Sequence, residues 1–228
     1  PYVIKTDGLA AGKGVLVTDS IDEAQTAVEE YLSGTAFGGA GEKIVLEEGL
    51  IGPEISILAI TDGKKVVALS PAQDFKRLHN NDHGPNTGGM GAYSPVPIAT
   101  PTLVNDVLDN FIQPTINTLN ERGINYRGVL YAGLMLTSEG PKLLEYNVRF
   151  GDPEAQVVLP RFETSLTELL IDAASGDIKA TPTFTSDAMV TVVCSTEGYP
   201  TTPKVGDPIT GIEEAARTHG IENVYAAG

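Results

Sequence analysis

The sequence contains no tryptophan and only one cysteine, Cys194. A single thiol excludes an internal disulfide framework and any zinc or iron–sulfur centre built from several cysteines. The neighbouring valines, Val190, Val192 and Val193, predict that Cys194 is buried, because free cysteines commonly pack in cores. No uninterrupted run of about 18 apolar residues occurs, so the sequence predicts no membrane-spanning helix.

Basic residues are also scarce: 15 Lys and Arg stand against 30 Asp and Glu, which gives a net charge of −15. A chain this acidic has no general electrostatic attraction for nucleic acid or for an anionic membrane surface. We therefore expect small-molecule partners and a cytoplasmic location. Any phosphate that binds must be held by a few local cations and by backbone N–H groups.

The 228 residues are enough for a sizeable core. The first five residues look like the middle of a strand and not like a signal peptide, which indicates a piece of a longer protein. Helix N-caps are expected at Ser20, Thr100 and Ser165, with a kink at Pro114. Predicted strands cover residues 2–5, 15–18, 44–47, 54–61, 66–70, 129–137, 142–150 and 188–194. Hairpins with flanking helices predict an α+β fold.

Residues 74–97 are rich in Gly, Pro and polar side chains and show little periodicity. We expect an irregular stretch there, and so long a stretch is usually functional. Two histidines, His79 and His83, lie within it. They could be metal ligands, but solvated or substrate-facing histidines are favoured, because no further His or Cys completes a site. Residues 181–187 are expected to form a linker.

The segment from Lys5 to Gly14 is rich in glycine and carries a lysine near each end. Glycines let backbone N–H groups approach phosphate oxygens. The spacing matches neither a Walker A loop nor a dinucleotide-binding fingerprint. The alternatives are a flexible hairpin tip and a lid over a bound nucleotide, and the two lysines favour the lid.

The segment 142–150 has a period of two, which places Glu145, Asn147 and Arg149 on one face of a strand. The other face, with Leu144, Tyr146, Val148 and Phe150, is expected to pack in the core. A carboxylate and an amide oxygen on a rigid element are hard ligands that suit Mg²⁺. The alternative is an amphipathic surface strand whose polar face is solvated.

Four motifs together resemble the glycinamide ribonucleotide synthetase (phosphoribosylamine–glycine ligase) family of ATP-grasp ligases. The octapeptide RFGDPEAQ at 149–156 is the most specific of them. Residues 5–15, 84–95 and 130–135 match the family in the same order, so the resemblance covers essentially the whole chain. It implies an ATP-grasp fold of two α+β subdomains, 1–61 and 62–185, followed by the beginning of a C-terminal domain, 186–228. It also implies that the family's N-terminal domain and the end of the C-terminal domain are absent.

The resemblance also implies roles for individual residues. Glu145 and Asn147 match the metal ligands, and Arg149 and Lys13 are the candidates for catalysis at the transferred phosphoryl group. ATP binding is implied for Lys5, Asp7, Gly8, Gly12, Gly14, Glu47, Glu48, Leu50 and Glu54. Substrate binding is implied for Asp74, Lys76, Asn86, Thr87, Gly88, Gly89, Met90, Gly91, Asp152 and Pro153. Gly49 departs from the family, which usually has an aromatic residue at this hinge, and Pro53 stands where an acidic residue is common.

The implied activity is ATP-dependent ligation of glycine to 5-phosphoribosylamine, with Mg²⁺ or Mn²⁺, by a monomer or homodimer in purine biosynthesis. A glycyl phosphate would form first, and the amine would then displace phosphate. The alternative is a nucleotide-binding fragment or regulatory module without ligase chemistry. The retained Glu145, Asn147 and Arg149 favour the ligase. A kinase is disfavoured, because the sequence has neither a Walker loop nor the protein-kinase motifs.

Overall fold

The computed structural model describes residues 1–10, 14–81, 83–220 and 223–226. Its strands are β1 (Tyr2–Thr6), β2 (Val15–Thr18), β3 (Ile44–Glu48), β4 (Glu54–Thr61), β5 (Val66–Ala68), β6 (Gln73–Asp74), β7 (Arg77–His79), β8 (His83–Asn86), β9 (Gly91–Ser94), β10 (Gly128–Thr137), β11 (Gly140–Asn147) and β12 (Met189–Val192). Its α-helices are α1 (Ile21–Leu32), α2 (Pro101–Val107), α3 (Gln113–Glu121), α4 (Ala155–Val158), α5 (Leu166–Ser175) and α6 (Ile212–His219). The mixture confirms the α+β prediction.

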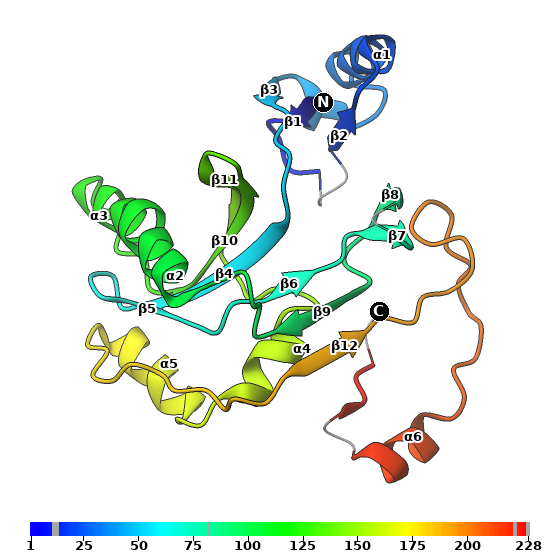
Figure 1. Cartoon of the computed structure of the whole chain (residues 1–228). Coiled ribbons are helices and arrows are strands. Elements are labelled where there is room, and N and C mark those ends of the chain that lie inside the picture. Colours follow the sequence, from blue (N-terminus) through cyan, green and yellow to red (C-terminus); the bar gives the residue numbers. More distant parts are fainter. Residues whose placement is uncertain (11–13, 82, 221–222, 227–228) are drawn as a thin grey trace.

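A small sheet of order β2-β1-β3 stands apart from the main body (Figure 1). Helix α1 covers one of its faces, where Ile4 packs against Ala24, Ala27 and Tyr31. The helix begins as predicted, because the Ser20 hydroxyl accepts a hydrogen bond from the backbone N–H of Glu23. The opposite face of this sheet is left open toward the main body.

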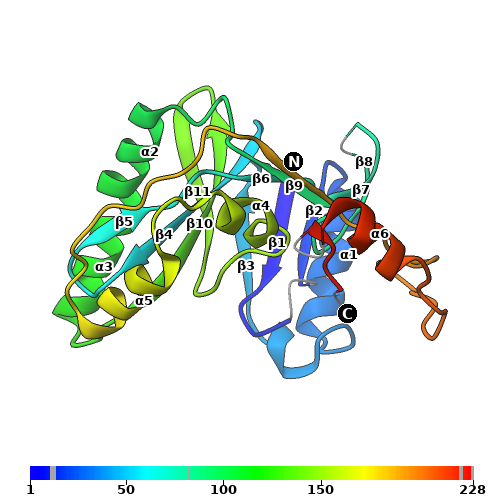
Figure 2. The same ribbon diagram turned by 90° about the horizontal axis from the view of Figure 1, so that it is seen from below.

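The main sheet has the order β11-β10-β4-β5, with every neighbouring pair antiparallel. Strand β4 is buried on both faces because its alternate side chains enter two different cores. Ile55 and Ile57 pack toward α2 and α3, whereas Leu58 and Ile60 pack toward α4 and α5. Figure 2 shows helices on both sides of these strands. The small remaining sheets are β12-β9-β6 and β7-β8.

The helix predicted to kink at Pro114 is interrupted immediately before that residue. A π-helical turn, Leu108–Ile112, separates α2 from α3. Proline lacks an N–H and its ring clashes with the carbonyl of the preceding turn, and a wider turn accommodates both effects. The N-cap at Thr100 is confirmed, since its hydroxyl accepts a hydrogen bond from the N–H of Leu103.

The prediction of an irregular segment at 74–97 was wrong, since the end of β6 and all of β7, β8 and β9 lie there. These strands are two to four residues long, and β9 pairs with β12, which is about a hundred residues further along the chain. Pairing at that sequence separation leaves no local periodicity to detect.

The prediction that Cys194 is buried was also wrong: the residue is exposed. It follows the end of β12, where Val190 is 73% and Val192 is 76% exposed. The apolar run does form the predicted strand, but β12 is at the edge of its small sheet and only its Met189 packs against a core. An apolar sequence pattern does not reveal which face of an edge strand is covered.

The predicted linker, 181–187, is fixed to the main body by the buried side chain of Arg161. This guanidinium donates to the backbone carbonyls of Thr185 and Asp187 and to the hydroxyls of Ser70 and Ser94.

In the part of the chain that the structure describes, no helix is both long and apolar enough to cross a membrane.

Asp62, in the turn between β4 and β5, joins the turn to the chain after α5. The backbone N–H of Ile178 donates to one carboxylate oxygen, and those of Lys64 and Lys65 donate to the other, at 2.8–2.9 Å. Burial alone would raise the pKa of this carboxyl. The three N–H donors, Ile178 first, outweigh burial and hold the pKa below its ordinary value.

Replacing Asp62 should therefore weaken the fold in a pH-dependent way. Asp62→Asn is expected to lower the free energy of unfolding at pH 7 by about 1.5–3 kcal/mol, because an amide group cannot accept all three hydrogen bonds. Since the folded-state pKa is depressed, the stabilisation is complete above the unfolded pKa of about 4 and is lost as pH falls through the folded value. The deficit of the variant should therefore shrink in acid.

Urea unfolding at a series of pH values measures this difference, with Asp106→Asn, an exposed residue of α2, as the control. A deficit of constant size from pH 7 to pH 2 would contradict the assigned role of the Asp62 charge.

Candidate functional site

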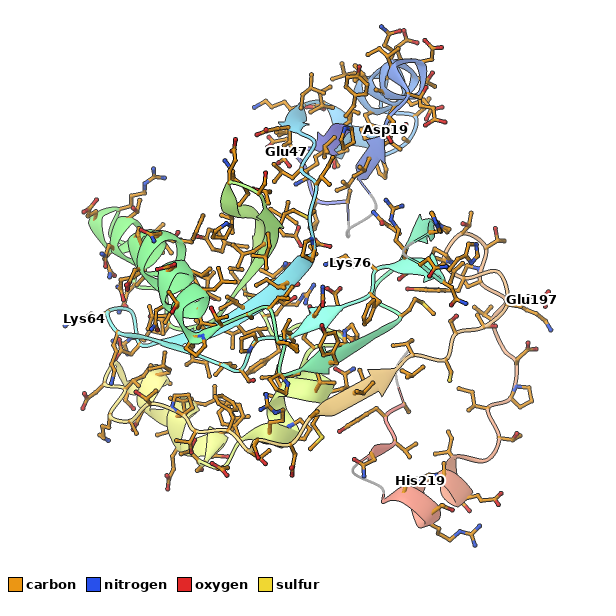
Figure 3. The ribbon with its side chains drawn as sticks, viewed as in Figure 1. Asp19, Glu47, Lys64, Lys76, Glu197 and His219 are labelled. Carbon is orange, nitrogen blue, oxygen red and sulfur yellow. The ribbon has the colours of Figure 1, made fainter. Side chains whose placement is uncertain are left out.

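A cleft of about 2200 Å³ separates the open face of the small sheet from the main body. It brings together residues from the beginning, middle and end of the first 150 positions. The predicted site residues that line it are Lys5, Gly8, Glu47, Glu48, Leu50, Glu54, Asp74, Lys76, Asn86, Thr87, Gly88, Met90, Gly91, Glu145, Asn147 and Arg149. Figure 3 shows Glu47 and Lys76 on opposite walls.

The other predicted residues are placed differently. Gly12 and Lys13 lie outside the described residues. Asp7 and Gly14 are not part of the lining; each is tied into the small subdomain by a backbone hydrogen bond, to the chain at Lys43 and Thr6 respectively.

Gly89, Asp152 and Pro153 also do not line the cleft, but they lie together behind its wall. A Cβ on Gly89 would come within 2.4 Å of the Pro153 ring, and φ at Gly89 is +121°. This close approach requires a glycine at position 89. The glycine-rich segment and the octapeptide, distant in sequence, are therefore packed against each other.

On the wall formed by the small sheet, Lys5 and Glu47 form an ion pair with an Nζ–Oε2 distance of 2.6 Å. Their strands are neighbours, and the two residues are diagonal partners on the face that is turned to the cleft. The sequence predicted both residues for the site but not their pairing. An anion that binds Lys5 must compete with this carboxylate.

On the wall formed by the main body, Lys76 lies between two carboxylates. Its Nζ is 3.0 Å from Asp74 and 3.2 Å from Glu54. Burial acts to lower the pKa of Lys76, but the two carboxylates outweigh it and the pKa is raised. The pKa of Glu54 is also raised, mainly by burial and further by Asp74 and Glu145, while Lys76 opposes the shift.

Strand β11 supplies Glu145 and Asn147, which are both turned to the cleft. The Asn147 amide donates to a Glu145 carboxylate oxygen at 3.0 Å, so the two side chains are adjacent, as the alternation predicted. Among the described residues, no cluster of three or more His, Cys, Asp and Glu side chains could hold a metal by itself. A cation at this pair would need further ligands from the substrate or from water.

The other face of β11 corrects the sequence prediction. Pairing with β10 shifts between Glu145 and Leu143, which leaves Leu144 as a β-bulge. The bulge breaks the period of two, so that Leu143 and Tyr146 pack against the same core and Leu144 does not; Leu143 and Leu144 both reach the cleft. The strand ends at Asn147, and Val148, predicted to be buried, is 71% exposed. Of the predicted core residues, Tyr146 and Phe150 do pack inward.

The sequence analysis missed the apolar part of the cleft. Val3, Val15 and Val17 project from the small sheet on the same side as Lys5, and Leu144 faces the cleft from the main body. Apolar side chains therefore line both walls beside the charged groups. The alternation of Val3 with Lys5 was the signal that could have identified this surface.

A buried polar network that was also missed lies beneath the octapeptide. The carboxylate of Glu154, 2% exposed, accepts hydrogen bonds from the hydroxyls of Ser56 and Tyr131, each at 2.9 Å. Burial, followed by the neighbouring Glu154, raises the pKa of Tyr131. Tyr131 is the cross-strand partner of Asn147, and a Cβ on Gly151 would collide with the carboxylate of Glu154. The network therefore joins β4, β10 and the loop before α4.

A Cβ at Gly49 would lie 2.0 Å from the Pro1 carbonyl oxygen, so this backbone has no room for the aromatic residue usual at the hinge. His79 and His83 are cross-strand partners in the β7–β8 hairpin, and His79 lines the cleft.

The profile of the family described as "Phosphoribosylglycinamide synthetase, ATP-grasp (A) domain" matches residues 1–155. The phosphoribosylamine–glycine ligase of Streptomyces coelicolor is 50% identical over 218 residues, which are 95% of this chain and 50% of that protein. The trifunctional purine biosynthetic protein adenosine-3 of Bos taurus is 49% identical over 228 residues, 99% of this chain and 22% of that protein.

Among solved structures, the phosphoribosylamine–glycine ligase of Thermotoga maritima is similar with a TM-score of 0.79 and 36% identity, over 90% of this chain and 51% of that one. Biotin carboxylase of Campylobacter jejuni has a TM-score of 0.65 at 16% identity, over 89% of this chain and 44% of that one, a likeness of fold alone. The chain spans about half the length of the bacterial ligases that it matches. These matches confirm the predicted ATP-grasp fold.

The lysine between the two carboxylates offers a direct test of the site electrostatics. Lys76→Met should raise the pKa of Glu54 further, because it removes the charge that, among the described residues, lowers this pKa, while burial and the repulsion of Asp74 and Glu145 remain. A ¹³C NMR titration of the glutamate carboxyl groups measures this pKa. Lys179→Met, which removes an exposed partner of Asp172, is the control and should leave Glu54 unaffected. An unchanged or lowered pKa of Glu54 in Lys76→Met would refute the charge arrangement.

Proposed function

Because the chain belongs to the phosphoribosylglycinamide synthetase family, through its ATP-grasp domain, we propose that it forms the nucleotide- and metal-binding part of a ligase that joins glycine to 5-phosphoribosylamine. The products are glycinamide ribonucleotide, ADP and phosphate. The observation that carries the proposal is the cleft, in which Lys5, the Glu54–Lys76–Asp74 cluster and the Glu145–Asn147 pair face a common space. The protein acts in the cytoplasm as a monomer or homodimer. The units 1–61, 62–185 and 186–228 are its proposed divisions.

The proposed ATP site lies between the two walls of the cleft. The adenine ring fits between Val3, Val15 and Val17 on one side and Leu144 on the other, and the backbone of residues 47–50 offers hydrogen bonds to its edge. Glu54, on the main-body wall, accepts the ribose hydroxyls. Lys5, next to the glycine-rich loop, binds phosphate oxygens, and its pairing with Glu47 holds the lysine in the cleft until the nucleotide arrives.

The proposed metal site is the Glu145–Asn147 pair. One carboxylate and one amide oxygen on a single strand fit a hard divalent cation, Mg²⁺ or Mn²⁺, that takes its remaining ligands from phosphate and water. When bound, such a cation neutralises phosphate charge during transfer. Glu145 is exposed to the cleft and so is free to bind it.

The reaction requires activation of glycine, because a carboxylate oxygen is a poor leaving group. A glycine carboxylate oxygen attacks the γ-phosphorus of ATP and the bond to ADP breaks, giving glycyl phosphate. The amine of phosphoribosylamine then attacks the carbonyl carbon and phosphate leaves with the electrons of its C–O bond. Positioning and charge stabilisation provide most of the catalysis in phosphoryl transfer, and Lys5, Lys13 and Arg149 supply that charge against a net charge of −15.

The substrate wall consists of Asp74, Lys76 and the segment 86–91, with Asp152 and Pro153 packed behind Gly89. Lys76, kept protonated by its two carboxylates, is suited to hold a substrate anion, while Asp74 is suited to hold an ammonium group. The alternative, a nucleotide-binding module without ligation, is disfavoured because the proposed metal pair and Arg149 all face the cleft.

The metal assignment predicts different losses at two neighbouring positions. In the full-length protein, Glu145→Ala should reduce ligation at least about 100-fold, because it removes the charged ligand. Asn147→Ala should have a smaller effect, because it removes a neutral ligand. Neither change should alter the thermal midpoint appreciably, since neither side chain packs in a core.

Steady-state assays at several Mg²⁺ concentrations measure this, with Glu139→Ala, at the exposed turn before β11, as the control. Turnover close to that of the wild type in Glu145→Ala at saturating Mg²⁺ would contradict the assignment.

The ligase proposal itself predicts glycine-dependent chemistry. With ATP, phosphoribosylamine and glycine labelled with ¹⁸O in its carboxylate, the full-length protein should release ADP and transfer one labelled oxygen to inorganic phosphate. Mass spectrometry of the phosphate measures the label, and omission of glycine is the control. ADP release that is independent of glycine, or phosphate without label, would favour a nucleotide-binding module without ligation or another reaction.

A further inference from the structure

The glycine-rich segment 86–91 of the substrate wall is held in place by hydrogen bonds that its backbone N–H groups donate. The N–H of Thr87 donates to the carbonyl of Lys76 at 2.7 Å, and the N–H of Met90 donates to that of Phe75 at 2.7 Å. The N–H of Gly89 donates to the Thr87 hydroxyl at 3.0 Å. The first two contacts join the segment to Phe75 and Lys76, between β6 and β7, and the third lies within the segment.

The amide of Gly88 has a different partner. Its N–H donates to the hydroxyl oxygen of Tyr199 at 2.9 Å, across 111 positions of sequence. Gly88 lines the cleft, whereas Tyr199 does not. A Cβ on Gly88 would lie 3.2 Å from the same hydroxyl oxygen, so the absence of a side chain allows the close approach.

Tyr199 is held by the loop that carries it. The N–H of Lys204 donates to the carbonyl of Glu197 at 2.9 Å, and the Thr196 hydroxyl donates to the carbonyl of Lys204 at 2.6 Å. The N–H of Thr202 donates to the carbonyl of Gly198 at 2.8 Å. Hydrogen bonds thus join the two sides of this loop, before and after Tyr199; Glu197 marks the loop in Figure 3.

The same stretch of chain contacts the glycine-rich segment at a second point. The N–H of Val193, directly after β12, donates to the carbonyl of Met90 at 3.0 Å. Gly88 and Met90 are therefore both bonded to residues beyond position 190. The wall of the cleft at Gly88 takes its position from a part of the chain that lies outside the residues matched to the ATP-grasp domain.

We propose that Tyr199 is a positioning residue, which fixes the amide of Gly88 and thereby shapes the site for glycine. The inference rests on the proposed ligase function. Tyr199 acts through Gly88 and does not touch ATP, whose proposed binding groups are on β1, β2, β3, β4 and β11. Loss of its hydroxyl should thus weaken glycine binding while nucleotide binding is retained.

The test is Tyr199→Phe in the full-length protein, which removes one oxygen and keeps the ring. The KM for glycine should rise about three- to tenfold, the loss expected for one neutral hydrogen bond. The KM for ATP and kcat should stay within twofold of the wild type. Tyr225→Phe, at a tyrosine that is 52% exposed, is the matched control. A KM for glycine that is unchanged would overturn the proposal, and so would equal losses in every parameter together with a lower thermal midpoint.

A double-mutant cycle with Gly88→Ala tests the contact itself. The added Cβ is crowded by the Tyr199 hydroxyl, and Phe at position 199 relieves that crowding. The combined change in the KM for glycine should therefore be smaller than the product of the two single changes. Strictly multiplicative effects would show that the two residues are not coupled and would overturn the proposal.

Failure of the ligase function and failure of the role of Tyr199 would give different results. If the wild-type protein shows no glycine-dependent ADP release, the ligase function fails, and with it the role of Tyr199 in glycine binding. If the wild type ligates glycine but Tyr199→Phe binds it equally well, only the role of Tyr199 fails.

Discussion

The site depends on a strand that must be buried on both faces and yet begin with a charged residue. Strand β4 is inaccessible over most of its length because each face meets a separate core. Its first residue, Glu54, emerges from that cover at the edge of the cleft and pairs with Lys76, while Ser56, two residues further on, is buried and bonded to the Glu154 network. Two hydrophobic cores thus hold the polar groups of the main-body wall in place. A side chain fixed from both sides has little freedom to reorganise when a ligand enters, which is how preorganised sites reduce the cost of binding.

An acidic chain with a proposed nucleotide site must keep its few cations available. Lys5 and Lys76 each have a carboxylate partner in the structure. Such pairing costs some phosphate affinity, because the anion must compete with a neighbouring charge. For Lys76 the pairing also outweighs the effect of burial and keeps the side chain protonated, because the two carboxylates raise its pKa. Net charge alone therefore says little about what the cleft binds; the local arrangement of a few side chains decides it.

Much of this molecule could be predicted where the determining interactions are local. The caps at Ser20, Thr100 and Ser165 and the turns between β4 and β5 and between β10 and β11 were found because each depends on neighbouring residues. The errors lie where the cause is distant. The bulge at Leu144 is set by pairing with β10, and the exposure of Cys194 by the position of β12 at a sheet edge. Glu154 stood inside the quoted octapeptide, but its partners Ser56 and Tyr131 are separated from it by 98 and 23 positions.

The buried tyrosine under the octapeptide has an optical consequence. The chain has eight tyrosines, six phenylalanines and no tryptophan, so tyrosine dominates the aromatic fluorescence of its side chains. An ordinary tyrosine ionises near pH 10, but Tyr131, enclosed and beside the Glu154 carboxylate, keeps its proton at pH values where exposed tyrosines have lost theirs. In alkaline solution the ring of Tyr131 is therefore spectrally distinct from the exposed ones, and the protein contains its own reporter on the strand next to the proposed metal pair.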